Sequence, residues 1–210
     1  MDIAIFGGTF NPPTRAHEWM ILELGDEFDR VLVVPTAVTW HKKPISQNEV
    51  GFTFDERLEL CEYVFGNDGP TLDILDIERK YIGVEGHGFA DTLQDIMDMY
   101  GHEHTYTVAM GGDSFEILHL WKNHEFILAH ANILVFDRPG YTSENEHIRA
   151  HIVHWTCPDE VSSTQARKLL HELCGNVSNV YTAKKCLEII QRRGFDWDDN
   201  ELNGRSYDRE

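Results

Sequence analysis

Basic residues are scarce in this chain. Its 210 residues include 18 Lys and Arg against 36 Asp and Glu, which gives a formal net charge of −18. So acidic a surface repels polyanions, and this argues against non-specific binding to nucleic acid and against docking on an anionic membrane. Any phosphate-bearing substrate would need a local group of cations to offset the field of the whole chain.

Cysteines and long apolar runs are also few. The four cysteines are far apart, form no CxxC pair and follow no signal peptide, so reduced thiols are the simplest interpretation. No apolar run approaches the ~20 residues that a membrane helix requires. We therefore expect a cytoplasmic protein with neither a membrane nor a nucleic acid as partner. The sequence leaves open whether copies of the chain form a homo-oligomer.

Strand-like and helix-like segments alternate along the chain. Short apolar runs predict strands at 3–6, 31–35, 71–75, 106–110, 133–136 and 151–155. Helical patterns lie between them, including 89–100 and 113–128, the latter broken near Trp121. This alternation predicts an α/β fold with a mainly parallel sheet flanked by helices, in which ligands bind beyond the carboxyl ends of the strands.

Other helices are predicted by their apolar faces. These faces consist of Ala16, Met20, Ile21 and Leu24; of Leu58, Cys61 and Phe65; of Ala166, Leu169, Leu170 and Leu173; and of Ala183, Leu187 and Ile190. Periodicity stops at Asp196. We expect one domain over residues 1–195 and an acidic, disordered tail over 196–210.

A glycine pair follows the first predicted strand in "IAIFGGTFNPPTRAHEWMI". Gly7 and Gly8 would let backbone N–H groups approach an oxyanion, and a helix beginning near Thr14 would point its positive end at the same space. Thr14 and His17 are three residues apart and so share a helix face. The segment has neither the Walker A pattern nor GxGxxG. Taken alone, it fits a tight strand–helix turn with a partly buried histidine at least as well.

A second candidate for phosphate binding is "EVSSTQARKLL", residues 160–170. Ser162 and Gln165 have capping-box spacing, which predicts a helix start. Ser163 and Thr164 would present hydroxyls and backbone N–H groups in its first turn, and Arg167 could reach back over that end. An ordinary capped helix with an exposed arginine is the alternative interpretation.

Histidines and single polar residues carry weaker signals. His147 and His151 are one helical turn apart, and "HEH" at 102–104 is compact, but neither has a third ligand at convincing spacing, so we predict no protein metal site. Trp121 could equally fill a core, Asp113 could cap a helix, and Arg138 could be solvated.

Several of these motifs together resemble a known family. "GGTFNPPTRAH" resembles the GGTFDPPHxGH signature of the nucleotidylyltransferase superfamily, and "VSSTQAR" resembles its [IV]S[ST]TxxR signature. "WHKK", "ERLEL", "GGDSFEILHLWKNHEFI" and "FDRPGY" follow in the order seen in bacterial nicotinate mononucleotide adenylyltransferases. "VYTAKKCLEIIQRRGFD" is similar to that family's closing helix. More distant superfamily members, which act on pantetheine phosphate or polyol phosphates, lack the GGDxxxxLxxW and FDRPGY segments.

The resemblance implies a Rossmann-like, doubly wound fold and an activity. That activity is adenylyl transfer from ATP to nicotinate mononucleotide, giving deamido-NAD and pyrophosphate in NAD biosynthesis, with Mg²⁺ bound mainly through the substrate phosphates. The catalytic residues implied are Thr14, His17, Lys42 and Arg167. The ATP-binding residues implied are Gly7, Gly8, Thr9, Phe10, His17, Gly111, Asp113, Ser163, Thr164 and Arg167. The mononucleotide-binding residues implied are Phe10, Trp40, Phe89, Ala90, Thr92, Asp113, Trp121 and Arg138.

The sequence departs from the family pattern at a few positions. Thr14 replaces the commoner histidine, and Ala16 replaces the glycine of the xGH core. The "SYTxDTL" segment, which helps recognise the pyridine carboxyl, is "HGFADTL" here. Nicotinamide mononucleotide therefore stays an alternative acceptor, and a non-catalytic nucleotide-binding module is an alternative of a different class.

Overall fold

The computed structural model describes residues 1–37, 51–66, 71–140, 142–148, 152–157, 163–173 and 186. Six strands form one parallel sheet: β1 (Asp2–Gly8), β2 (Arg30–Pro35), β3 (Leu72–Ile74), β4 (Thr105–Gly111), β5 (Asn132–Asp137) and β6 (Ile152–Thr156). Their spatial order is β3-β2-β1-β4-β5-β6. All six predicted strands are confirmed, and the order is that of a doubly wound Rossmann-type sheet.

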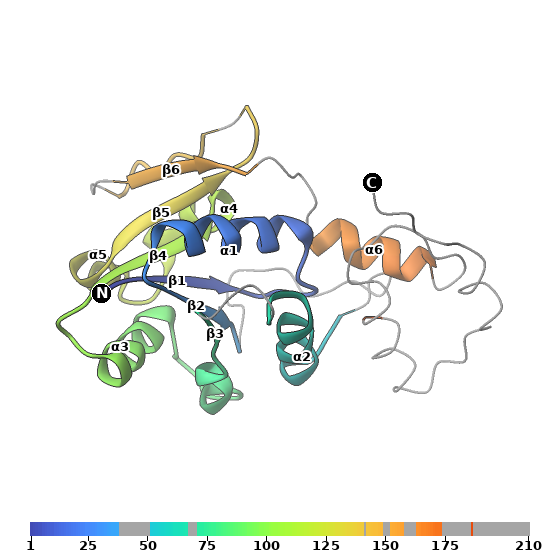
Figure 1. Ribbon diagram of the computed structural model, residues 1–210, viewed down its shortest axis with the longest axis horizontal. Helices are drawn as coiled ribbons and strands as arrows, with labels where there is room; N and C mark the ends of the chain where they lie inside the picture. Colours follow the sequence, from blue (N-terminus) through green and yellow to red (C-terminus); the bar gives the residue numbers. More distant parts are fainter. Residues whose placement is uncertain are drawn as a thin grey trace.

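The helices fall on both faces of the sheet, as Figure 1 shows. They are α1 (Arg15–Glu27), α2 (Phe54–Phe65), α3 (Phe89–Tyr100), α4 (Gly112–Phe115), α5 (His124–His130) and α6 (Ser163–Leu173), with short 3₁₀ turns η1 (Ile77–Tyr81) and η2 (Leu118–Leu120). One core cluster packs α3 and α5 against the sheet, and the other packs α1 and α2 against it.

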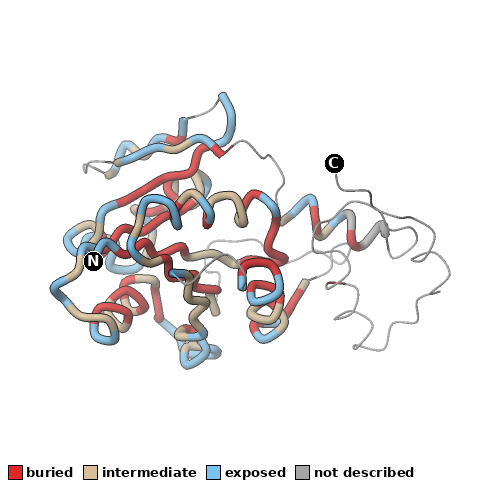
Figure 2. Tube along the Cα trace, viewed as in Figure 1, coloured by how far each residue is buried: buried red, intermediate tan, exposed pale blue. Residues whose placement is uncertain are grey.

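Alternation along the strands explains this two-sided core. In β1, Ile3 and Ile5 belong to the α3 side, whereas Ala4 and Phe6 belong to the α1 side. Successive side chains of a strand point to opposite faces, so a strand buried on both faces must be apolar throughout. Figure 2 shows the result, with the central strands buried along most of their length.

One predicted helix is divided more than the sequence suggested. The segment 113–128 contains α4, η2 and α5, with breaks before η2 and after Trp121. Asn123 begins α5 from a left-handed conformation, φ 53°, which no helix interior accommodates. The predicted closing helix and the predicted tail at 196–210 lie outside the described residues, apart from Cys186.

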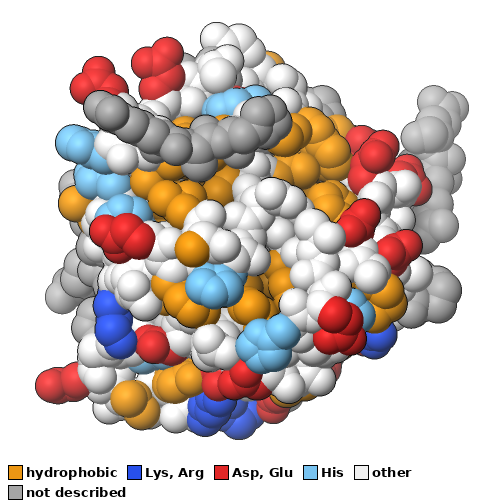
Figure 3. All heavy atoms as spheres, turned by 90° about the vertical axis from the view of Figure 1, so that its left-hand side faces the viewer, with side chains coloured by type: hydrophobic (Ala, Val, Ile, Leu, Met, Phe, Trp, Pro, Cys, Tyr) orange, Lys and Arg blue, Asp and Glu red, His pale blue; other side chains and the backbone are white. Residues whose placement is uncertain are grey.

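The surface matches the acidic composition. Figure 3 shows the side of the molecule from which the strands begin, where acidic and histidine side chains are scattered and basic ones are few. None of the helices in the described residues is long and apolar enough to cross a membrane.

Candidate active site

The loop after β1 lies at the carboxyl edge of the sheet, beside the point where the strand order reverses between β1 and β4. A Cβ on Gly7 would stand 3.0 Å from Cε2 of Phe89, and a Cβ on Gly8 would stand 2.9 Å from Cζ of Phe10. Both glycines are therefore needed for close packing of aromatic rings. The ring of Phe10 is almost fully buried and lies 5.1 Å from the His17 ring, centroid to centroid.

Helix α1 begins where the sequence predicted, with Thr14 as its N-cap. The backbone N–H of Thr14 donates to Nδ1 of His17 at 3.0 Å, and the Thr14 hydroxyl lies 2.9 Å from the same nitrogen. His17 thus fills the place that Glu or Gln takes in a capping box. A backbone amide can only donate, so Nδ1 must be the acceptor and the neutral ring carries its proton at Nε2.

The start of α6 contacts the same loop from a distant part of the sequence. The Ser163 hydroxyl donates to the carbonyl of Pro12 at 2.8 Å, and Nη1 of Arg167 donates to the carbonyl of Asn11 at 2.9 Å. Nη2 of Arg167 donates to the Thr164 hydroxyl at 3.2 Å. Figure 1 shows α6 beside the first turn of α1. The structure therefore brings together the two segments that the sequence marked as phosphate-binding candidates.

Gly111 and Asp113 lie at the carboxyl end of β4, one strand away from the glycine loop. Asp113 forms an exposed ion pair with Arg138, Nη2 to Oδ2 3.1 Å. The loop that carries Arg138 is held by the buried carboxylate of Asp137, which accepts the Ser143 N–H at 2.9 Å and lies 2.6 Å from Nδ1 of His154. Arg138 is thus on a braced loop, with its guanidinium in solvent.

The residues predicted to hold the mononucleotide divide into two groups. Phe89 and Trp121 are half-buried, with ring centroids 5.7 Å apart, and Phe89 packs over Gly7. Ala90 and Thr92 are buried, and the Thr92 hydroxyl donates to Oε1 of Glu78 at 2.9 Å. They support the site from behind its surface. Two more predicted site residues, Trp40 and Lys42, belong to the segment 38–50, which lies outside the described residues.

Comparison with known proteins identifies the family of this chain. Residues 5–169 match the cytidylyltransferase-like family. The chain belongs to that family. A Fusobacterium nucleatum protein named "Probable nicotinate-nucleotide adenylyltransferase" is 29% identical over 66% of this chain and 68% of its own length. A Geotalea uraniireducens protein of the same name is 34% identical over 67% of this chain and 62% of its own length, so the matched region spans about two thirds of these relatives.

Solved structures share the fold. The Plasmodium falciparum nicotinic acid mononucleotide adenylyltransferase, complexed with NaAD, superposes with a TM-score of 0.68 at 18% identity, covering 92% of this chain and 96% of that one. The crystal structure of a putative nicotinate-nucleotide adenylyltransferase from Vibrio parahaemolyticus gives a TM-score of 0.61 at 21% identity, covering 90% and 92%. The predicted resemblance and the predicted Rossmann-like fold are both confirmed.

Two charged residues within the matched region of this cytidylyltransferase-like protein had no role predicted from the sequence, although one of them, Arg57, stands in the family-like segment "ERLEL". Arg57 and Glu78 are charged, yet only 5% and 2% of their surfaces are exposed. Burial lowers the pKa of Arg57, which the nearby Cys61 and Glu78 partly counteract. The sequence held a signal for Arg57, because it stands four residues before Cys61 on the apolar face of α2. A charge on an apolar helix face needs a buried partner.

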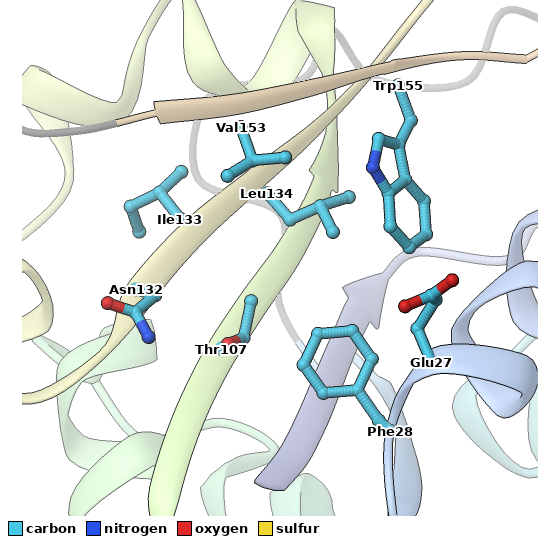
Figure 4. A pocket seen from close by; sticks show the side chains of 8 residues that line it. All are labelled: Glu27, Phe28, Thr107, Asn132, Ile133, Leu134, Val153 and Trp155. Carbon is cyan, nitrogen blue, oxygen red and sulfur yellow. The ribbon is translucent and has the colours of Figure 1, made fainter.

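A separate hollow lies at the other end of the sheet. Its volume is about 370 Å³, and its lining comes from the end of α1 and from β4, β5 and β6 (Figure 4). Thr107 and Asn132 lie near the amino ends of their strands. Ligands of parallel α/β sheets bind at the opposite edge, so this hollow is separate from the candidate site.

Proposed function

We propose that this chain transfers the adenylyl group of ATP to nicotinate mononucleotide, giving deamido-NAD and pyrophosphate in NAD biosynthesis. Family membership and the named relatives support the reaction class. The observation that carries the proposal is the contact of Ser163 and Arg167 with the loop after β1, because it sets the first turns of α1 and α6 at one place. Two helix N-termini at one place form a site for a polyphosphate.

The reaction needs alignment more than covalent help from the protein. A phosphate oxygen of the mononucleotide forms a bond to the α-phosphorus of ATP, and the bond from that phosphorus to the bridging oxygen breaks. The electron pair leaves with pyrophosphate. The attacking phosphate is already ionised, so no general base is required. The protein must hold two polyanions in line and stabilise charge on the leaving group.

In this proposal His17 acts as a hydrogen-bond donor. Its Nδ1 accepts from Thr14, so Nε2 carries the proton, and we assign that N–H to a phosphate oxygen of ATP. Gly7, Gly8, Thr9 and Phe10 would line the nucleotide, with backbone N–H groups directed at its phosphates. Ser163, Thr164 and Arg167 would hold the phosphates from α6, and Lys42 would add a further cation.

Mg²⁺ belongs to the proposal as a companion of ATP. When bound, it neutralises phosphate charge and favours departure of pyrophosphate. Among the described residues, no group of three or more His, Cys, Asp or Glu side chains could hold a metal ion. As the family resemblance implies, the oxygen ligands of Mg²⁺ would come mainly from the substrate phosphates.

The acceptor would lie against α3 and α4. Phe89 and Trp121 offer half-buried aromatic surfaces near Gly7, which suit a pyridine ring. Gly111, Asp113 and Arg138 would contact the ribose and phosphate. A second candidate is the same chemistry on nicotinamide mononucleotide, favoured by the departure of "HGFADTL" from the family segment. The buried thiol of Cys61 is in keeping with our expectation of a reducing cytoplasmic setting.

The test is pyrophosphate release in the presence of protein, Mg²⁺ and ATP, with each pyridine mononucleotide supplied separately. We expect release with nicotinate mononucleotide and a lower kcat/KM with nicotinamide mononucleotide. The reverse preference would assign the second candidate. No release with either acceptor, together with saturable ATP binding, would overturn the proposal in favour of a nucleotide-binding module.

A further inference from the structure

We propose that Arg57 and Glu78 form a buried clamp that positions the main chain of the phosphate loop for catalysis. The inference rests on the proposed function. Both residues are almost fully buried, so the proposal gives neither of them a contact with substrate. Their hydrogen bonds go to segments that surround the candidate site: the loop after β1, the end of β2 and helix α3. They are positioning residues.

Arg57 connects the segments that follow two adjacent strands, β1 and β2. Its Nη1 donates to the carbonyl of Thr9 at 2.6 Å, and its Nη2 donates to the carbonyl of Thr36 at 2.7 Å. The Thr36 N–H in turn donates to the carbonyl of Gly8 at 2.8 Å. The forked guanidinium is suited to holding two acceptors in a fixed relation, which a lysine ammonium is not.

These bonds determine which way the loop amides face. In a planar trans peptide the C=O and the N–H point in opposite directions. The carbonyls of Gly8 and Thr9 accept from Thr36 and Arg57, so the N–H groups of Thr9 and Phe10 face away from these partners. Successive N–H groups of this kind form an anion-binding concavity. Arg57 thereby orients the amides that would meet the ATP phosphates.

Arg57 also stabilises an unfavourable backbone conformation. Phe10 has φ +45°, in the left-handed region that bulky residues avoid. Its ring is held by edge contacts with Phe6 and Phe65, centroids 5.5 and 5.8 Å away. The hydrogen bond from Arg57 to the Thr9 carbonyl fixes the peptide group that precedes Phe10. Backbone strain of this kind persists where the surroundings over-determine it, and it clusters at functional sites.

Glu78 extends the clamp to α3. Its Oε2 accepts the N–H of Ala37 at 2.6 Å, and its Oε1 accepts the Thr92 hydroxyl at 2.9 Å. Ala37 immediately follows Thr36 and precedes the segment with Trp40 and Lys42, whereas Thr92 lies one turn beyond Phe89. The carboxylate therefore joins the polypeptide leading to the predicted phosphate ligand with the helix that carries the predicted pyridine contact.

The charges explain why both partners are needed. A guanidinium removed from water without an anion nearby is strongly disfavoured, and the same holds for a carboxylate. The charge of Glu78 raises the pKa of Arg57 against the larger lowering by burial. Buried charges held by hydrogen bonds contribute little stability compared with apolar packing, so their best-attested use is to specify one arrangement. Here that arrangement is the geometry of the site.

The experiment compares Arg57→Met, Arg57→Lys and Glu78→Gln with the control Arg79→Met. Arg79 is a neighbour in space, since it and Arg57 both lie over the ring of Phe54, but Arg79 is exposed and, within the described part of the chain, forms ion pairs with Asp55 and Asp76. For each variant, pyrophosphate release is measured at varied ATP and at varied mononucleotide, per active enzyme counted by tight binding of a non-hydrolysable ATP analogue. Hydrogen exchange of peptides covering 7–10 and 36–37 is followed in parallel.

We expect Arg57→Met to lower kcat per active site at least about 10-fold and to raise KM for ATP, with Arg57→Lys recovering part of the loss. Glu78→Gln keeps the shape of the side chain, but only one of its two terminal atoms can accept a hydrogen bond. We expect it to lower kcat less than Arg57→Met does and to speed hydrogen exchange at 36–37. Arg79→Met stays at the wild-type level in every measurement. A merely structural role would lower Tm and the active fraction while kcat and KM per active site stay unchanged, and this result would overturn the clamp.

Two further outcomes are informative. If Arg57→Met does not fold, Arg57→Lys and Glu78→Gln decide the matter, because each keeps a polar side chain of similar size in the buried position and loses only part of its hydrogen bonds. If the wild-type chain releases no pyrophosphate with either mononucleotide, the proposed function fails. The clamp is then judged on exchange alone: unchanged protection at 7–10 and 36–37 in all variants refutes it, and faster exchange there supports it.

Discussion

The proposal gives His17 two tasks on two different ring nitrogens, and substitution can separate them. Nδ1 accepts the Thr14 N–H at 3.0 Å, and Nε2 carries the proton that we assign to a phosphate of ATP. An asparagine at this position places its carbonyl oxygen about where Nδ1 stands but has no donor further out. A glutamine, which is a usual capping-box residue at this position, can accept the Thr14 N–H through its amide oxygen and still carries an amide NH2 as a donor near Nε2. His17→Ala removes both groups.

The free energy lost differs between the contact of Nδ1 with Thr14 and the proposed contact of Nε2 with ATP. Loss of the N-cap contact costs helix α1 roughly 1 kcal/mol, because one buried donor loses its partner. Loss of one donor to charge developing in the transition state costs about 2.7–4 kcal/mol, or 10²–10³ in kcat. We therefore expect His17→Asn to keep nearly wild-type stability with kcat reduced at least about 10²-fold. His17→Gln should also keep nearly wild-type stability, because it can complete the capping box, and should retain more activity than His17→Asn, whereas His17→Ala should lose both.

The assay combines urea unfolding with pyrophosphate release at saturating ATP and nicotinate mononucleotide. Stability and turnover should rank the variants differently, which a single structural role for the ring cannot produce. Near-normal turnover by His17→Asn would refute the assignment of the Nε2 proton to catalysis. Equal losses of kcat in His17→Asn and His17→Gln would show that a donor near Nε2 does not account for turnover, contrary to the separation argued from the Thr14 contact.

Gly8→Ala should destabilise the protein by about 1–3 kcal/mol, because the new Cβ would stand 2.9 Å from the Phe10 ring, whereas Gly25→Ala, with nothing within 4 Å, should be stabilising in urea unfolding. Burial raises the pKa of the Cys61 thiol far above its usual range, so that thiol should resist a disulfide reagent at pH 8 until the protein unfolds. Burial alone would raise the pKa of the Asp91 carboxyl, but the hydrogen bonds from Lys122 and from the Gly88 N–H lower this pKa by more. The net pKa of Asp91 is therefore below the ordinary value. The stabilisation is therefore present above the unfolded pKa and is lost as pH falls through the folded one, so Asp91→Asn should lower Tm at pH 7 and make little difference near pH 2.

The sheet was predictable because its sequence signal is local. Each central strand is a short run of apolar residues, and burial on both faces requires that pattern. The start of α1 was equally local, since Thr14 and His17 lie within one turn. The division of 113–128 was harder, because the left-handed Asn123 breaks a continuous amphipathic pattern at a residue that helices can contain. Local propensity does not reveal such a turn.

The site depended on contacts that no local pattern encodes. Arg167 bonds to Asn11 across 156 positions, and the sequence suggested each partner without showing that they meet. The position of Arg57 on an apolar face indicated a buried partner, but not that the partners would be carbonyls of the first loop. Thr92 matches the threonine of the family segment, but its hydroxyl donates to buried Glu78 and does not reach the surface. Resemblance identifies such residues and leaves their contacts open.

Two prolines leave the first loop with carbonyls that would repel an anion, and side chains of α6 donate hydrogen bonds to these carbonyls. The peptide units that end at Pro12 and Pro13 have carbonyls but no N–H, so they could only repel a phosphate. Those two carbonyls, of Asn11 and Pro12, accept from Arg167 and Ser163. The carbonyl of Thr9 accepts from Arg57 in the same way. A chain with a net charge of −18 can thus present donors to an anion, because Arg57 and Arg167 occupy acceptors of the loop while the N–H groups of Thr9 and Phe10 face away from these partners.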